Sequence, residues 1–193
     1  MNSQWVLTAA HCIQPFKSQL ELLTVVLGEH NYKLDFETKE RQFRVEAAHM
    51  HPAFEPFSEF GLLKLAEEVQ FTTYPLIRPI CLPGPSDRDH DLGRRAFVSG
   101  WGDTIDNYWI RGSSYLKELE VEIYKGGHVC QIGEYGDDSN FCAKSVNVLD
   151  DKTCKGDSGG PLIAKVRFDF LMIFYFYFYQ RCTQIARFIV GLV

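Results

Sequence analysis

The sequence predicts an all-β protein, a barrel or a sandwich, made of two β subdomains. Helical periodicity is scarce along the 193 residues, whereas short apolar runs bounded by Gly, Pro, Asn and Asp recur, and several alternate as half-buried strands do. A segment rich in Pro, Gly and charged residues divides the chain into near halves. We therefore expect a single domain with an N-terminal subdomain over residues 1–80, a connector over 81–95 and a C-terminal subdomain over 96–193.

Seven apolar runs account for the predicted strands. In chain order they are WVLTAA (5–10), LLTVVLG (22–28), FRVEAA (43–48), FGLLKLA (60–66), RAFVSGWG (95–102), YLKELEVEIY (115–124) and PLIAKVRF (161–168). Turn-forming residues separate the runs, and this spacing is typical of an all-β barrel or sandwich.

Two segments near the C-terminus have other patterns. The apolar run FLMIFYFYFY at residues 170–179 is well short of the roughly 20 residues that span a bilayer, so we interpret it as a buried strand or a misread tail, not as a membrane anchor. The final segment TQIARFIVGLV, residues 183–193, has apolar residues at helical spacing and predicts a short C-terminal helix.

Charge and cysteine content narrow the class of protein. The 20 Lys and Arg against 25 Asp and Glu give a net charge of -5 without a basic stripe, which argues against a nucleic-acid partner. Six cysteines without a close Cys-x-x-Cys pair favour an oxidised extracellular framework over a zinc or thioredoxin-type site. We expect a secreted protein, although the N-terminus MNSQWVLTAAHC does not have the pattern of a signal peptide.

Three residues have the types that a nucleophilic serine site needs. Ser158 lies in CKGDSGGPLIA, His11 lies in TAAHC, and Glu59 directly precedes the run FGLLKL. A serine hydroxyl is a weak nucleophile at neutral pH, so it requires a base within hydrogen-bond reach and a third group that orients the base. Taken singly, His11 and Glu59 would more often be ordinary structural or solvated residues.

The stretches WVLTAAHC, FGLLKL, VSGWG and CKGDSGGPL, in this order, closely resemble the trypsin and chymotrypsin family of secreted serine endopeptidases. The resemblance extends from Asn2 to about Leu162 and returns faintly at TQIARFI. It implies a fold of two six-stranded antiparallel Greek-key barrels, here incomplete, with a short C-terminal helix. It also implies cleavage of peptide bonds through an acyl-enzyme.

The resemblance gives each site residue a role. Ser158 would attack the peptide carbonyl, His11 would take its proton and return it to the leaving amine, and Glu59 would orient His11. The backbone N–H groups of Gly156 and Ser158 would form the oxyanion hole. Asp157 would pair with the amine that activation cleavage releases, and this ion pair would order the oxyanion hole.

Two residues depart from the family's pattern. Glu59 stands where the family has Asp, and because the extra methylene must be absorbed by moving the backbone or the imidazole, we expect lower activity. Lys152 stands at the floor of the specificity pocket, where it would repel basic substrate side chains and favour acidic or polar ones. The alternative is that Lys152 extends into solvent and pairs with Asp150 or Asp151.

Both ends of the chain also depart from the pattern. Met1 stands downstream of the family's activation site, so we expect an incomplete N-terminus and no source for the amine that would meet Asp157. After Leu162 the family's pocket-wall strand is replaced by KVRFDFLMIFYFYFYQR. A mis-joined gene model would explain both ends. We therefore expect low or no peptidase activity, and the alternative function is that of a non-catalytic homologue that binds a protein partner.

The resemblance also implies disulfides. It pairs Cys130 with Cys142 and Cys154 with Cys182, while Cys12 and Cys81 would bond to upstream cysteines that this chain lacks. A bridge that is frequent in the family is replaced at both of its ends by alanine. The two replaced positions are Ala96 and Ala164.

Calcium is the only cofactor that the sequence suggests. Glu29, Glu37 and Glu40 offer the oxygen donors that calcium prefers and resemble the family's calcium loop in position. Solvated carboxylates are the favoured interpretation of these residues, so no cofactor is expected. The expected partners are protein or peptide substrates and protein inhibitors, and the expected state is a monomer.

Overall fold

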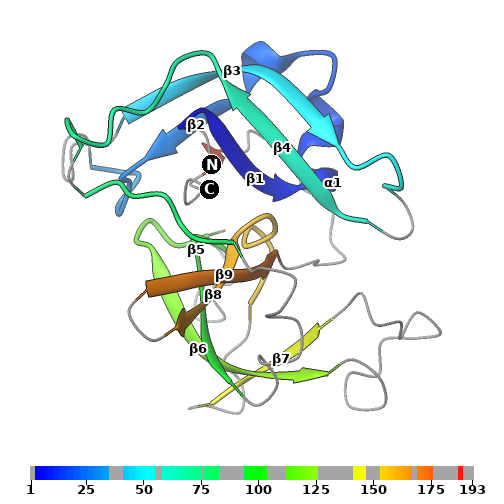
Figure 1. Cartoon of the computed structure of the whole chain (residues 1–193), viewed down its shortest axis with the longest axis vertical. Coiled ribbons are helices and arrows are strands. Elements are labelled where there is room, and N and C mark those ends of the chain that lie inside the picture. Colours follow the sequence, from blue (N-terminus) through cyan, green and yellow to red (C-terminus); the bar gives the residue numbers. More distant parts are fainter. Residues whose placement is uncertain are drawn as a thin grey trace.

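The computed structural model describes ten stretches of the chain, and all structural statements below concern them. They are residues 3–34, 41–54, 58–74, 76–82, 94–103, 112–125, 141–146, 153–166, 169–175 and 187–188. Strands dominate these stretches and form two five-stranded sheets. Figure 1 shows the strands between residues 5 and 65 in the upper half of the molecule and those between residues 95 and 175 in the lower half.

The first sheet has the strand order β1-β4-β3-β2-β10. Its strands are β1 (Trp5–Ala9), β2 (Thr24–Leu27), β3 (Arg41–Met50), β4 (Phe60–Leu65) and β10 (Arg187–Phe188). The pairs β1–β4, β4–β3 and β3–β2 are antiparallel, and β10 runs parallel to β2. Between β1 and β2 lie the helix α1 (Ala10–Ile13) and the 3-10 turns η1 (Gln14–Phe16) and η2 (Leu20–Leu22).

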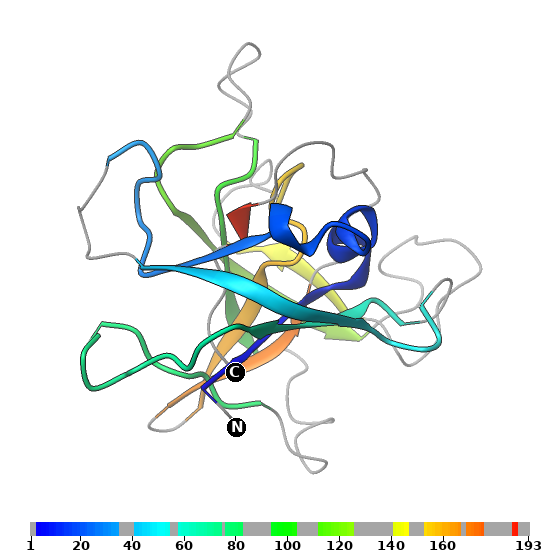
Figure 2. The same ribbon diagram turned by 90° about the horizontal axis from the view of Figure 1, so that it is seen from above.

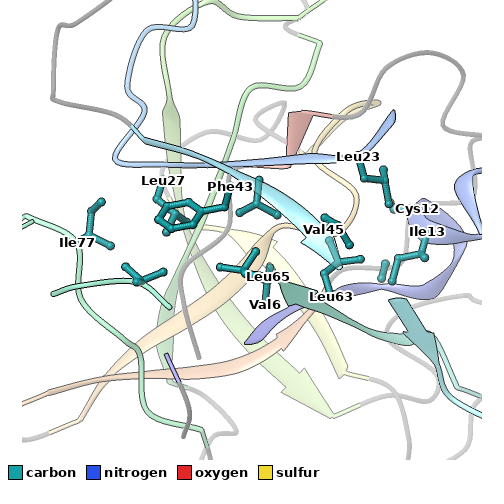
Figure 3. Packing of buried hydrophobic residues seen from close by; sticks show 13 residues of the cluster. Val6, Cys12, Ile13, Leu23, Leu27, Phe43, Val45, Leu63, Leu65 and Ile77 are labelled. Carbon is teal, nitrogen blue, oxygen red and sulfur yellow. The ribbon is translucent and has the colours of Figure 1, made fainter. Parts of the chain in front are cut away.

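Alternation along the strands builds the first core. In β4 the buried Gly61, Leu63 and Leu65 alternate with the more exposed Phe60, Leu62 and Lys64, because successive side chains of a strand point to opposite faces. The inward residues of β1, α1, β2, β3 and β4 converge in one cluster, shown in Figure 3. Its fully buried large members include Phe43, Ile13, Leu23, Leu27, Leu63, Leu65, Val6 and Val25.

The second sheet has the strand order β7-β6-β5-β8-β9, and all its pairs are antiparallel. Its strands are β5 (Arg95–Gly100), β6 (Lys117–Lys125), β7 (Phe141–Ser145), β8 (Pro161–Val166) and β9 (Asp169–Tyr175). Ala96 and Ala164 lie directly opposite each other in the β5–β8 register, and both are fully buried. The two positions where alanine replaces a frequent bridge are therefore neighbours in space.

The two halves meet along a seam between the loop after β2 and the segment before β6. Asn31 forms a β-bridge with Tyr115, the Leu116 N–H donates to the His30 carbonyl at 2.8 Å, and the Tyr32 N–H donates to the Ser114 carbonyl at 3.2 Å. Seen from above in Figure 2, the strands of the first sheet pass over those of the second. These contacts hold the two halves against each other.

The all-β prediction with two sheets is confirmed. All seven predicted runs contain a strand, and the start of the apolar run at 170–179 forms most of β9. Strand β7 was not predicted, because the sequence FCAKS is short and contains no β-branched residue. In the described part of the chain, each sheet has five strands where the resemblance implies six.

The prediction of a C-terminal helix is wrong at residues 187 and 188, the two residues of the final segment that the structure describes. Arg187 and Phe188 form β10, whose Cα partners are Thr24 and Val25 of β2. The final segment contains Ile185, Phe188 and Ile189, which favour strands, and the free edge of β2 offers backbone hydrogen bonds that a short helix cannot match. None of the helices in the described stretches has the length and apolarity that crossing a membrane requires.

Candidate active site

His11 lies on the short helix that follows β1 without a break. Ala9 is extended, with φ -82° and ψ 140°, and the next residue, Ala10, already belongs to α1. The Ala10 N–H donates to the Glu59 carbonyl at 2.8 Å, so the segment before β4 satisfies a helix-start donor that no capping side chain reaches. Cys12 and Ile13 are buried in the first core, which fixes the orientation of the helix and places His11 at its margin.

Glu59 holds His11 through a single oxygen atom. Oε2 of Glu59 lies 3.0 Å from the ring Nδ1 of His11 and accepts the backbone N–H of His11 at 3.2 Å. An ionised carboxylate can only accept, so Nδ1 carries the proton in this contact and Nε2 carries the lone pair. The imidazole is thereby set up to take a proton at Nε2, an atom that is buried from solvent.

Ser158 lies in a double turn between residue 154 and β8. The Asp157 N–H donates to the Cys154 carbonyl at 3.1 Å, and the Gly160 N–H donates to the Asp157 carbonyl at 3.0 Å. Gly156 and Gly159 have φ of 99° and 82°, a region that L side chains rarely adopt. The glycines around Ser158 therefore form a backbone path that other residues would strain.

The turn over residues 154–160, here called the serine turn, packs on the junction between β1 and α1. Cys12 donates from its Sγ to the Ser158 carbonyl at 3.6 Å, and Thr8 donates from its Oγ1 to the Gly159 carbonyl at 3.4 Å. Thr8 and Cys12 flank His11 in sequence. The fold thus brings His11, Glu59 and Ser158, which are far apart along the chain, into one region where the two sheets meet.

Asp157 is held by backbone donors beneath the serine turn. Its Oδ1 accepts the Gly102 N–H at 2.8 Å, and its Oδ2 accepts the Cys154 N–H at 2.9 Å. Burial raises the pKa of this carboxyl, and the neighbouring Asp103 also raises it. The two backbone hydrogen bonds oppose the shift without cancelling it. A Cβ at Gly100 or Gly102 would lie 2.1 Å or 2.5 Å from Oδ1, so the Gly-Trp-Gly stretch leaves room for the carboxylate.

Comparison with known proteins identifies the family. The family model described as Trypsin matches residues 1–189. The chain belongs to the trypsin family. Named relatives include phenoloxidase-activating enzyme 1 of Spodoptera litura, 32% identical over 86% of this chain and 46% of that protein. Melanization protease 1 of Drosophila melanogaster is 30% identical over 84% of this chain and 45% of that protein.

The alignment with a third relative covers a larger share of the chain. Proclotting enzyme of Tachypleus tridentatus is 32% identical over 95% of this chain and 51% of that protein. This trypsin-family chain therefore spans about half the length of these three relatives. The resemblance to the trypsin family that the sequence motifs indicated is therefore confirmed.

Several predicted residues of this trypsin-family chain lie outside the described residues. These are Lys152, Cys130, Cys182, Glu37 and Glu40. Cys142 lies in β7, and Cys154 has a free thiol in the structure, so the predicted disulfides stay predictions. Glu29 accepts the N–H of His30 at 3.1 Å. Over the described stretches, no group of three or more His, Cys, Asp or Glu is arranged to hold a metal ion.

Sequence reasoning missed two features of the site. Thr8 is a fully buried polar residue at an inward position of β1, and Gly100 and Gly102 form the space around Asp157. A hydroxyl at an inward strand position is the signal that could have drawn attention to Thr8. The two glycines of VSGWG carried no such signal, because only the fold shows that the carboxylate lies against them.

Proposed function

We propose that this chain is a serine-type endopeptidase domain that cleaves peptide bonds through an acyl-enzyme on Ser158. The observation that carries the proposal is the contact of Glu59 Oε2 with both the Nδ1 and the backbone N–H of His11. This contact supports a role for Glu59 as the group that orients the base, despite the extra methylene.

In the proposed reaction, Ser158 Oγ attacks the substrate carbonyl carbon while His11 Nε2 takes the hydroxyl proton. The negative charge that develops on the carbonyl oxygen is stabilised by the N–H groups of Gly156 and Ser158. His11 then gives the proton to the leaving amine, and the C–N bond breaks to leave an ester on Ser158. A water molecule, deprotonated by His11, hydrolyses the ester and restores the serine hydroxyl.

We further propose that activity is low while Asp157 has no cationic partner. Over the described residues, the bonds to its carboxylate come from backbone N–H groups, and burial raises its pKa. A buried carboxylate without a cation is unfavourable, so the serine turn above it is held less firmly than an ion pair would hold it. This observation also favours the second candidate, a non-catalytic homologue that binds a protein partner.

The proposed substrates are extracellular proteins. The support comes from two of the relatives, a proclotting enzyme and a phenoloxidase-activating enzyme. Lys152 supports cleavage after acidic or polar side chains rather than after Lys or Arg. The chain is proposed to act as a secreted monomer that protein inhibitors can block.

The proposed function is tested by labelling with a serine-directed phosphonate probe. The unmodified chain, Ser158→Ala and His11→Ala are compared, with the rate of covalent labelling followed by mass spectrometry. Slow labelling of the unmodified chain at Ser158, lost in Ser158→Ala and strongly reduced in His11→Ala, is expected. Absence of labelling at saturating probe in the folded chain would favour the binding module instead.

A further inference from the structure

We infer that Thr8 is a positioning residue for the proposed reaction, because its hydroxyl joins the serine turn to the strand that leads into His11. The inference rests on the proposed function and names a residue that the family motifs leave without a role in it. Thr8 does not contact the reacting atoms in this scheme. It acts by holding the nucleophile's backbone against the base's backbone.

The first observation is that a polar side chain is buried at a strand position that usually holds an apolar one. Thr8 is fully buried on the inward face of β1, where Val6 also points. A buried hydroxyl is unfavourable unless it makes a hydrogen bond, and Thr8 Oγ1 donates to the Gly159 carbonyl at 3.4 Å. The bond joins residues 151 positions apart, so it is a tertiary contact and not a local turn.

The second observation is the closeness of the serine turn to β1. A Cβ at Gly159 would lie 2.6 Å from Thr8 Oγ1 and 3.4 Å from Cys12 Sγ. The absence of a side chain at Gly159 therefore permits the approach that the Thr8 bond needs. Because Cys12 bonds to the Ser158 carbonyl, the carbonyls of the nucleophile and of the next residue are both bound by residues on either side of His11.

The consequence follows from the place of the two catalytic groups. His11 belongs to the first sheet's half and Ser158 to the second, so the packing of the halves sets their relative position. The seam at Asn31 and Tyr115 also joins the two halves. Loss of the Thr8 bond would leave the serine turn free to shift by a fraction of an ångström relative to His11, and misplacements of about 1 Å can lower rates about 100-fold.

The test compares Thr8→Val, which keeps the shape but removes the hydroxyl, with Thr8→Ser, which keeps the hydroxyl. Thr24→Val in β2 is the matched control, a half-buried strand threonine of the same sheet. Phosphonate labelling is measured over a range of probe concentrations, to separate the maximal rate from the apparent binding constant, and thermal unfolding is measured in parallel. Ser158→Ala is included in the series.

We expect Thr8→Val to lower the maximal labelling rate about 10-fold or more while the apparent binding constant changes by less than about 2-fold. Thr8→Ser should keep most of the rate, and Thr24→Val should match the unmodified chain. Equal rates for Thr8→Val and the unmodified chain would overturn the inference. So would a loss in Thr8→Ser as large as that in Thr8→Val, because packing alone would then explain it.

A second measurement separates this inference from the proposed function. If the unmodified chain is not labelled at Ser158, the proposed function fails, and the anchoring of the turn is judged by amide hydrogen exchange. The Gly160 N–H, bonded to the Asp157 carbonyl, should exchange at least about 10-fold faster in Thr8→Val than in Thr24→Val. Equal exchange at Gly160 in the two variants would overturn the anchoring role.

Discussion

Oε2 of Glu59 lies 3.0 Å from Nδ1 of His11 and also accepts the backbone N–H of His11 at 3.2 Å. The charge on this oxygen stabilises the imidazolium that forms when His11 takes a proton. Glu59→Gln keeps the shape but removes that charge, so we expect the labelling rate at neutral pH to fall by about 100-fold or more. The control is Glu46→Gln, on an exposed carboxylate that pairs with Lys64, which should leave the rate unchanged.

Glu59→Asp tests whether the longer side chain is matched to this site. The Glu59 carboxylate already reaches Nδ1 of His11 at 3.0 Å. A carboxylate one methylene shorter must move the backbone to reach Nδ1. We expect the labelling rate to fall by about 10-fold. A rise would instead show that the glutamate itself limits activity, and that an aspartate geometry can be reached by a small shift.

Gly159→Ala should weaken both folding and labelling. Gly159 has φ 82°, and the added Cβ would lie 2.6 Å from Thr8 Oγ1, so strain and a clash combine. We expect a loss of about 1–3 kcal/mol in the free energy of unfolding, measured by urea titration.

The matched control for this substitution is Gly28→Ala. Gly28 has a similar φ of 78° but follows β2, outside the proposed site. It should lose stability through strain yet keep the labelling rate per folded molecule. Equal labelling rates for the two alanine variants would contradict a role of Gly159 in placing the serine turn.

Asp157 should make stability depend on pH in the direction opposite to an ordinary paired carboxylate. Burial raises its folded pKa above the ordinary value of 3.8, so between those two pKa values the folded state binds more protons than the unfolded state. The contribution of Asp157 to stability is therefore present below the unfolded pKa and is lost as pH rises through the folded pKa.

The measurement is the free energy of unfolding in urea at about pH 4 and about pH 7 for the unmodified chain and Asp157→Asn. Relative to Asp157→Asn, the unmodified chain should be more stable at the lower pH than at the higher one. Asp103→Asn removes the smaller of the two causes that raise the Asp157 pKa and leaves its burial in place, so it should keep most of this difference. A gap between the unmodified chain and Asp157→Asn that widens in favour of the unmodified chain as pH rises would contradict the expectation.

Two adjacent leucines of β4 test the predicted strand alternation. Leu63 is fully buried in the first core, whereas the Leu62 side chain is on the opposite face and 38% exposed. Leu63→Ala should lower the free energy of unfolding by about 2–5 kcal/mol because it leaves a cavity. Leu62→Ala should lower it by about 1 kcal/mol or less. Similar losses in the two variants would contradict the assigned faces of the strand.

Local pattern predicted most of the fold correctly. Alternation in FGLLKL and the short apolar runs elsewhere located seven strands, since side-chain direction in a strand follows from sequence parity alone. The local pattern failed where a neighbouring strand decides whether a segment forms a strand. β7 is a strand because β6 offers it an edge, and Arg187 and Phe188 are a strand because β2 does.

The motifs around His11, Glu59 and Ser158 identified the family and the residues of the candidate site without any coordinates, because each lies in a short stretch with its own signature. Their contacts depend on segments that are distant in the chain. Only folding brings Glu59 Oε2 to His11, Thr8 to Gly159, and the N–H groups of Gly102 and Cys154 to Asp157. Hydrogen bonds between remote residues follow from how two sheets pack together, and no local pattern of residues encodes that packing.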